Sequence, residues 1–146
     1  MKKLLLLTAA IALALPLAGC AKKAADTGTV VDDSLRLAFL NDHVYFDFDR
    51  YNIRPDQVPT LQAKAAYLNS NGSSAELQGY ADERGTEAYN MALGDRRSKS
   101  ARNYLIDLGI SGTRLSTVSY GESNPADPGH NEAAWARNRR VEFVLR

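Results

Sequence analysis

The sequence predicts an α+β domain in which helices pack against a mixed sheet of about four strands. Three observations support this class. Segments with the two-residue alternation of strands and segments with the apolar spacing of helices follow one another along the chain. Hydrophobic residues make up 45% of the 146 residues, which suits a single domain with a core of its own. The sequence contains no internal repeat of the kind that would indicate a solenoid.

Four short segments carry the strand predictions. They are residues 44–48, 75–80, 115–120 and 141–145. In the first, Val44, Phe46 and Phe48 fall on one face, as the two-residue period of a half-buried strand requires. The last segment alternates in the same way. We expect the four strands to run in mixed directions.

Three helices are predicted from apolar spacing and from the residues at their ends. The first takes Asp56 as its N-cap and stops at Gly72. The second is long, with Thr86 as its cap and a glycine stop at Gly109. A short third helix is predicted over residues 131–138.

Arg97 interrupts the apolar stripe of the long predicted helix. The stripe includes Tyr89, Leu93 and Ala101, and Arg97 lies in the same row. A buried guanidinium needs a partner, and Asp82, in the turn before the helix, is the nearest plausible counter-charge. Two interpretations stay open. The two residues form an internal ion pair that fixes the turn, or they hold a ligand that carries both charges, such as a zwitterionic amino-acid head group.

The N-terminal segment has the pattern of an export signal. Lys2 and Lys3 precede an apolar run at residues 4–15, and Cys20, the only cysteine of the chain, ends the sequence LAGC at residues 17–20. This ending resembles the lipobox of bacterial lipoproteins, which implies cleavage just before the cysteine and lipid on its new N-terminus. A retained transmembrane helix is the alternative, although the run is shorter than the ~20 residues that span a bilayer.

These features divide the chain into three parts. We expect a lipoprotein signal peptide over residues 1–19, a lipidated N-terminus and flexible tether over residues 20–34, and the folded domain over residues 35–146. Residues 33–40 fit either a short helix or an edge strand. Loss of the signal removes two of the 18 basic residues and leaves 16 against 17 acidic ones, a net charge of −1 that does not favour nucleic acid as a partner.

The segment at residues 79–97 resembles a family signature. It reads GYADERGTEAYNMALGDRR, which is similar to the signature of the OmpA-like peptidoglycan-binding domain, with Tyr80 where that family usually has histidine. Three further segments agree with the family: residues 44–53, 118–122 and 132–141. The resemblance covers nearly everything after the tether. It implies an OmpA-like fold and non-covalent binding of the peptidoglycan stem peptide through its meso-diaminopimelate residue.

The resemblance also implies which residues bind the ligand. They are Asp82, Arg97, Phe48, Asp49, Arg50, Tyr51, Asn90 and Leu93. By this correspondence Asp82 takes the ammonium of diaminopimelate and Arg97 its carboxylate, while residues 48–51 close over the ligand. Leu93 is expected as an apolar wall and Asn90 as a side chain that fixes the turn.

Location and partners follow from the two resemblances together. A lipid anchor in the outer membrane, on its periplasmic face, is expected, because Ala21 follows the cysteine where an aspartate commonly signals retention in the inner membrane. The family resemblance implies the Tol system of the cell envelope, with peptidoglycan and TolB as partners and TolA as a further candidate, in outer-membrane integrity and constriction at cell division. The alternative is a wall-binding lipoprotein with the same domain outside that system.

No enzyme, cofactor or metal is expected. Asp47, Asp49 and Asp82 suggest the paired carboxylates of a glycosidase, but nothing supplies an acid in an apolar pocket that faces a second carboxylate. His43 and His130 are far apart in the sequence and have neither a nucleophile nor metal ligands at a recognised spacing.

Overall fold

The structure, a computed structural model, describes residues 27–146, with side chains from residue 33 onward. The predicted signal peptide and the lipidation site Cys20 lie outside the described residues. In chain order the elements are α1 (Thr27–Asn41), β1 (Val44–Tyr45), α2 (Val58–Asn71), β2 (Ala75–Tyr80), α3 (Glu87–Asp107), β3 (Leu115–Gly121), α4 (Glu132–Asn138) and β4 (Arg140–Leu145). Short 3-10 turns at Pro55–Gln57 and Gly112–Arg114 precede α2 and β3.

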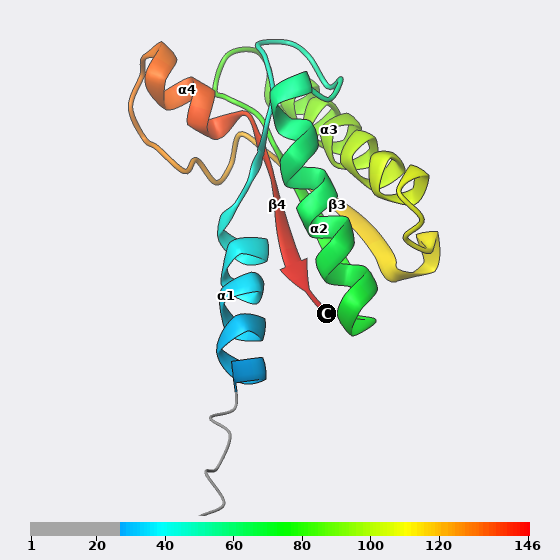
Figure 1. Cartoon of the computed structure of the whole chain (residues 1–146). Coiled ribbons are helices and arrows are strands. Elements are labelled where there is room, and N and C mark those ends of the chain that lie inside the picture. Colours follow the sequence, from blue (N-terminus) through cyan, green and yellow to red (C-terminus); the bar gives the residue numbers. More distant parts are fainter. Residues whose placement is uncertain (1–26) are drawn as a thin grey trace, which may run out of the picture.

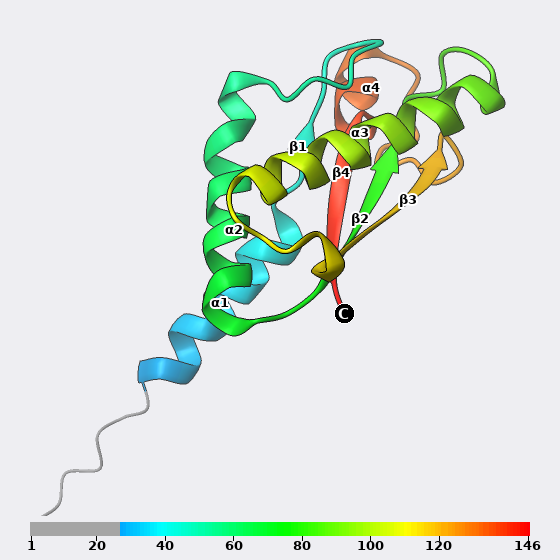
Figure 2. The same ribbon diagram turned by 90° about the vertical axis from the view of Figure 1, so that its right-hand side faces the viewer.

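The four strands form one mixed sheet in the order β1-β4-β2-β3. β3 runs parallel to β2, whereas β4 runs antiparallel to both β2 and β1. Figures 1 and 2 show α2 and α3 lying against one face of this sheet. The predicted class, a mixed four-stranded sheet with helices packed against it, is confirmed.

The hydrophobic core lies between the sheet and these helices. Leu61 and Leu68 of α2, Leu105 of α3, and Leu77 and Phe143 of the strands are each at most 2% exposed. Burial of apolar side chains from both layers therefore holds the helices on the sheet.

β2 and α3 touch through two glycines. A Cβ atom on Gly79 of β2 would overlap the carbonyl group of Gly94 in α3, and one on Gly94 would overlap the hydroxyl of Ser119. The helix therefore packs on the strand at backbone distance, closer than any larger residue permits. This contact fixes the start of α3 relative to the turn that follows β2.

Two helix ends follow their sequence signals, and one helix start does not. Thr86 caps α3, because its Oγ1 accepts a hydrogen bond from the backbone N–H of Tyr89 at 3.2 Å. α2 ends at Gly72, whose φ of 71° is a left-handed conformation that glycine adopts without strain. The prediction of Asp56 as an N-cap is wrong, because a 3-10 turn precedes α2 and the Asp56 carboxylate accepts hydrogen bonds from Arg54 instead.

β1 is shorter than the strand predicted at residues 44–48. Its ladder with β4 ends at Tyr45, and the N–H of Phe46 then donates to the carbonyl of Arg139. β4 begins only at the next residue, so it offers no further partner and the chain turns away. Phe46 is buried, but Phe48 is 54% exposed, so the prediction that Phe48 shares the buried face is wrong.

Residues 33–40, for which the sequence left two alternatives, are helical. They belong to α1, which begins at Thr27, so the segment predicted as a tether up to residue 34 is helical in its last part. Phe39 anchors the helix, and helical hydrogen bonds extend from this docked turn toward the N-terminus. Within residues 27–146, no helix combines the length and the apolar content needed to cross a bilayer.

α1 is docked only near its C-terminal end. The ring of Phe39 lies 5.0 Å from that of Tyr67 in α2 and 5.9 Å from that of Phe143 in β4. Leu35 and Leu37, which precede Phe39 by four and two residues, are about half exposed. The N-terminal part of α1 therefore projects from the domain, as Figure 1 shows.

Candidate functional site

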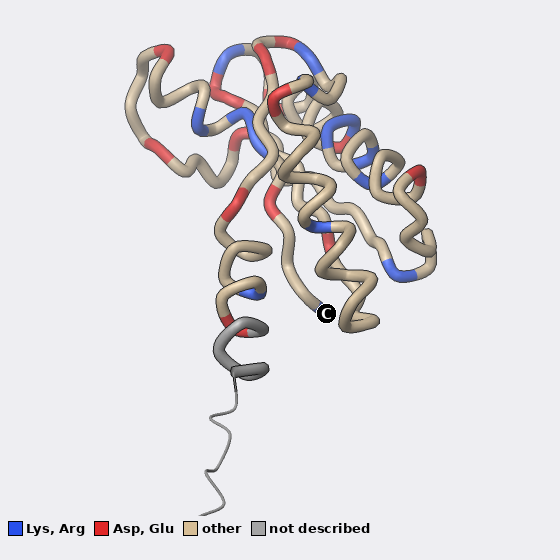
Figure 3. Tube along the Cα trace, in the orientation of Figure 1, with Lys and Arg blue, Asp and Glu red and all other residues tan. Residues whose placement is uncertain are grey.

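A cavity of about 260 Å³ lies where the loop after β1 meets the turn after β2 and the first turns of α3. It is lined by Phe48, Asp49, Asp82, Arg84, Gly85, Tyr89, Asn90 and Leu93. Five of the eight residues predicted for the site are among them, and Arg97, Arg50 and Tyr51 are not. Figure 3 shows charged residues of both signs gathered at this end of the domain.

Asp82 is a buried carboxylate in the cavity wall and is 4% exposed. Its Oδ1 accepts hydrogen bonds from Nε of Arg84 at 3.0 Å and from the Arg84 backbone N–H at 3.1 Å. Its Oδ2 accepts from Nη2 of Arg84 at 2.8 Å and from Nη1 of Arg139 at 3.3 Å. These four bonds fill the roughly four acceptor positions of a carboxylate.

Asp82 is ionised at neutral pH in spite of its burial. Burial alone raises the pKa of Asp82, but the hydrogen bonds from Arg84 and Arg139 outweigh it and leave the pKa below its usual value. The cavity wall therefore contains an ionised carboxylate, paired with the guanidinium of Arg84 in the same wall.

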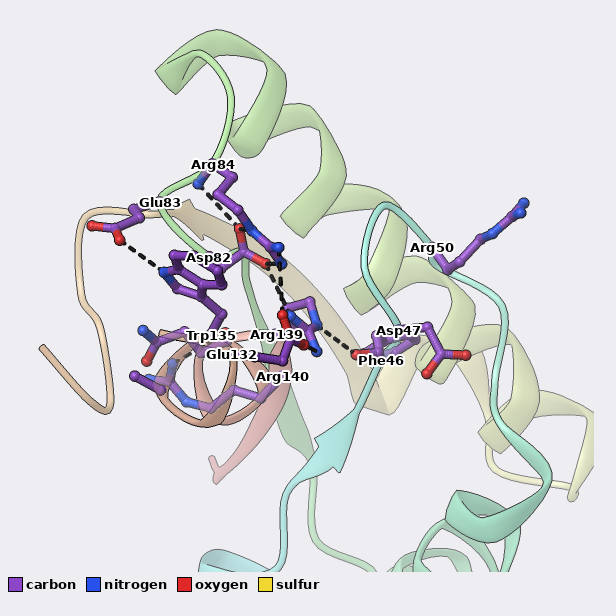
Figure 4. Close-up of polar contacts among 12 residues, drawn as sticks. Phe46, Asp47, Arg50, Asp82, Glu83, Arg84, Glu132, Trp135, Arg139 and Arg140 are labelled. Atoms are coloured by element: carbon purple, nitrogen blue, oxygen red, sulfur yellow. Dashed lines mark hydrogen bonds and ion pairs between the residues drawn. The ribbon is translucent and has the colours of Figure 1, made fainter. Parts of the chain in front are cut away.

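Arg84 lines the cavity, and the sequence analysis did not predict it there. Its guanidinium carbon lies 4.0 Å from the ring centroid of Phe48 and 4.2 Å from that of Trp135, so it stacks against two aromatic rings. Its Nη1 also lies 3.4 Å from a carboxylate oxygen of Glu132. Figure 4 shows Arg84 and Arg139 converging on Asp82.

Arg139, 5% exposed, connects three parts of the chain behind the cavity. Its Nε donates to the carbonyl of Phe46 at 3.0 Å, its Nη1 to Asp82 at 3.3 Å and its Nη2 to Glu132 at 2.7 Å. The sequence analysis did not assign it to the site, since Phe46 and Asp82 are far from it in sequence. A single guanidinium thus holds the loop, the turn and α4 together.

Arg97 is completely buried, as its place on the apolar stripe predicted. Its Nε donates to the carbonyl of Arg50 at 2.9 Å, its Nη1 to that of Tyr80 at 2.9 Å and its Nη2 to that of Asp47 at 3.0 Å. Burial lowers the pKa of Arg97 to about 10, so the side chain is still a cation at neutral pH.

This arrangement differs from the first interpretation that the sequence left open, a direct ion pair between Asp82 and Arg97. Within the described residues Asp82 pairs with Arg84 and Arg139, and no ion pair joins it to Arg97. Arg97 does not line the cavity either, because it lies behind the loop whose carbonyls it binds. Three converging backbone carbonyls satisfy the guanidinium, and such partners carry no side-chain signal in a sequence.

The loop side of the cavity has an uncommon backbone conformation. Asp49 has a φ of 55°, in the left-handed region that residues other than glycine seldom adopt. Its carboxylate accepts a hydrogen bond from the hydroxyl of Tyr89, and this bond raises the pKa of that hydroxyl. The bond joins the loop directly to α3.

Tyr89 was expected on the buried stripe of α3, and that prediction is wrong. The side chain is 43% exposed and lines the cavity. The reason is its place in the first turn of the helix, before Asn90, which is the first buried residue of α3. Sequence spacing does not show where the helix reaches the sheet.

Arg50 and Tyr51 belong to the loop but do not line the cavity. Figure 4 shows Arg50 pointing away from Asp82. Tyr51 is 48% exposed, and the guanidinium carbon of Arg96 lies 5.8 Å from its ring centroid. Only the first half of the predicted loop, Phe48 and Asp49, faces the cavity.

Asn90 and Leu93 line the cavity from α3. Asn90 is 1% exposed, and its Nδ2 donates to the carbonyl of Arg84 at 3.3 Å and to the carboxylate of Glu122. It therefore holds the turn that contains Asp82. Leu93 is 5% exposed and supplies an apolar part of the wall.

Tyr80 does not line the cavity. Its ring stacks on that of Tyr120 at 5.4 Å and lies 3.9 Å from the guanidinium carbon of Arg140, while its hydroxyl donates to Gln78 at 2.9 Å. Burial raises the pKa of this hydroxyl to about 12. Since neighbours in a strand face opposite sides of the sheet and Gly79 meets α3, tyrosine in place of histidine changes the far face rather than the cavity.

Comparison with known proteins agrees with this fold. Residues 45–139 match the model of the OmpA family. The chain is 46% identical over 99 residues to the peptidoglycan-associated lipoprotein of Pseudomonas putida, and this alignment covers 68% of the chain but only 60% of that protein. It is 37% identical over 153 residues to the peptidoglycan-associated lipoprotein of Agrobacterium fabrum (strain C58), with 93% and 85% covered.

A solved structure is also similar. The crystal structure of the peptidoglycan-associated lipoprotein from Burkholderia pseudomallei matches with a TM-score of 0.71 at 40% sequence identity, and covers 75% of this chain and 93% of that one. The residues matched by the family model include the loop, the turn and the helix that form the cavity. Sequence and fold therefore agree that the chain belongs to the OmpA family and, within it, to the peptidoglycan-associated lipoproteins.

Proposed function

We propose that this protein binds peptidoglycan non-covalently, with the diaminopimelate end of a stem peptide in the cavity beside Asp82. The observation that carries the proposal is an ionised carboxylate in the cavity wall together with a guanidinium behind the loop. The end of diaminopimelate bears an ammonium and a carboxylate on one carbon, so it matches a site that offers both charges.

The ammonium is assigned to the acidic side of the cavity. Asp49, an exposed residue, lines it with a carboxylate that also accepts the Tyr89 hydroxyl, and Asp82 is buried. Because the acceptor positions of Asp82 are already filled, the ammonium takes over a bond from Arg84, whose Nη1 keeps Glu132 as a partner. The exchange leaves every charged group with a counter-charge.

Arg97 supports the ligand carboxylate in two ways. Its charge favours an anion in the neighbouring cavity, and its three hydrogen bonds hold the loop that carries Phe48 and Asp49. This role replaces the direct contact that the family resemblance implied, because the guanidinium lies behind the loop.

The test is a titration of the purified protein with two muropeptides that carry diaminopimelate or lysine at the third position. Lysine lacks the terminal carboxylate, so we expect it to bind at least about tenfold more weakly. Asp82→Asn and Asp49→Asn should weaken binding of the diaminopimelate form. Asp95→Asn, which removes an exposed carboxylate elsewhere on α3, is the matched control. Equal affinity for the two muropeptides would contradict the proposal.

The same reasoning extends to location and partners. The LAGC sequence and the relatives' names support a lipid anchor on Cys20. We place that anchor in the outer membrane, on its periplasmic face, because alanine rather than aspartate follows the cysteine. We place the protein in the Tol-Pal system, with TolB and TolA as partners, in outer-membrane integrity and constriction at cell division. Loss of palmitate labelling in Cys20→Ser tests the anchor. Failure to co-purify with TolB would favour the alternative, a wall-binding lipoprotein outside that system.

Binding without catalysis is part of the proposal. A general acid needs a raised pKa, whereas hydrogen bonds keep the pKa of the Asp82 carboxyl low. Among residues 27–146, no group of three or more His, Cys, Asp and Glu side chains is placed to hold a metal ion. Incubation with purified sacculi should release no soluble muropeptides, and their release would revive the hydrolase alternative.

A further inference from the structure

Two tyrosines and an arginine form an exposed shelf beside the cavity. Of the seven tyrosines, all within the described residues, only Tyr51 and Tyr89 fall in the exposed class, at 48% and 43%. The guanidinium carbon of Arg96 lies 5.8 Å from the ring centroid of Tyr51 and 5.9 Å from that of Tyr89. We call these three residues the tyrosine shelf.

The shelf is continuous with the cavity. Tyr89 lines the cavity and its hydroxyl donates to Asp49, which lines it too, so one end of the shelf is at the cavity mouth. Tyr51 forms the other end, outside the cavity. The hydroxyl of Tyr89 is held by Asp49 and both rings lie near the Arg96 guanidinium, while their surfaces stay open to solvent, which reduces the entropy that a ligand must overcome.

The shelf suits a sugar ring better than it suits a peptide. A pyranose has a flat face of C–H groups and a rim of hydroxyls, and the electron-rich face of a tyrosine ring attracts such C–H groups. Among the described residues, Arg96 donates only its Nε, to the carbonyl of Ala92 at 3.3 Å, so its terminal N–H groups are available to sugar oxygens. The small alanine and glutamate residues of a stem peptide offer no comparable flat face.

The dimensions of the ligand agree with this assignment. Two amino acids separate diaminopimelate from the N-acetylmuramic acid that carries the stem, a span of about 7 Å when extended, and the free end of diaminopimelate lies about 5 Å further along its side chain, so the sugar is roughly 12 Å from the group in the cavity. A sugar at that distance from the cavity falls on the adjoining surface. We infer that the tyrosine shelf is a saccharide subsite for the N-acetylmuramic acid of the same strand whose stem peptide occupies the cavity, an inference that rests on the proposed function.

The test compares two ligands, the disaccharide-tetrapeptide and the same tetrapeptide freed of its sugars. The purified protein should bind the first about 2- to 10-fold more tightly, a range typical of one aromatic contact. Tyr51→Ala should abolish this difference by weakening only the sugar-bearing ligand, whereas Tyr51→Phe keeps the ring and should preserve it. Leu37→Ala, at a residue of similar exposure on α1, is the control and should change neither affinity.

The outcomes separate this inference from the function on which it rests. If the tetrapeptide binds in an Asp82-dependent way but the sugars add nothing, only the saccharide subsite is overturned. If Tyr51→Ala weakens both ligands equally, the shelf contacts the peptide and the inference fails as well. If neither ligand binds, the proposed function is overturned together with the subsite.

Discussion

Replacement of Arg97 by methionine should destabilise the domain by about 2–5 kcal/mol. The substitution keeps an unbranched side chain but removes three donors, and the carbonyls of Asp47, Arg50 and Tyr80 lose their partner. Hydrogen bonds to a charged group contribute about 1.5–3 kcal/mol each. Against this, the burial that lowers the pKa of Arg97 to about 10 costs about 3 kcal/mol, which the variant recovers.

Arg96→Met is the matched control for this measurement. Arg96 is the neighbouring residue on α3, is exposed, and makes one hydrogen bond within its own helix. We expect its substitution to change the free energy of unfolding by less than about 0.5 kcal/mol. Urea unfolding at pH 7, followed by the fluorescence of Trp135, gives the change in unfolding free energy of each variant. The change is read from the shift of the urea midpoint when the dependence of the free energy on urea concentration is the same in variant and wild type. A difference between the two variants below about 1 kcal/mol would refute the assignment of Arg97 as the support of the loop.

Three further outcomes follow from the structure. Gly79→Ala should destabilise the domain by about 3 kcal/mol or more in urea unfolding, because its Cβ overlaps the backbone of Gly94, whereas Gly72→Ala should cost only about 1 kcal/mol. Lys64 is 2% exposed, and burial lowers its pKa to about 8, so above that pH the folded state binds fewer protons than the unfolded state. The free energy of unfolding should therefore rise with pH from about 8 to 10 in the wild type, and rise less in Lys64→Met. The pKa of Asp82 is lowered in the folded state, so the carboxylate stabilises the fold above the usual carboxyl pKa range and loses this effect as pH falls through its folded-state pKa. In an acid titration, Asp82→Asn should therefore lose stability less steeply than the wild type below about pH 4.

The parts of the fold that could be predicted are those with local causes. The cap at Thr86 needs only a hydroxyl three residues before the backbone N–H from which it accepts a hydrogen bond. The stop at Gly72 needs only a residue that can adopt a positive φ. The burial of Arg97 was predictable for the same reason, since helical spacing alone puts it in an apolar row. Each of these signals lies within a few residues of its effect.

The parts that could not be predicted depend on partners far away in the chain. Phe48 continues a perfect alternation, yet it is exposed because the partner strand begins too late to pair with it. Arg84 enters the site by stacking on Phe48 and Trp135, and nothing near Arg84 in the sequence indicates either ring. The carbonyls around Arg97 are backbone atoms, whose positions no residue type reveals.

The pair of glycines between β2 and α3 has a consequence for how relatives diverge. No side chain lies between β2 and α3 where Gly79 meets Gly94, so a substitution that changes side-chain size cannot adjust their separation. Main-chain atoms alone set the distance between β2 and α3 at this contact. We therefore do not expect a change of ligand preference to come from a shift of α3 relative to β2. It must arise from the loop around Asp49 and from the outward-facing residues of the first helical turns, where exchange of side chains leaves that crossing intact.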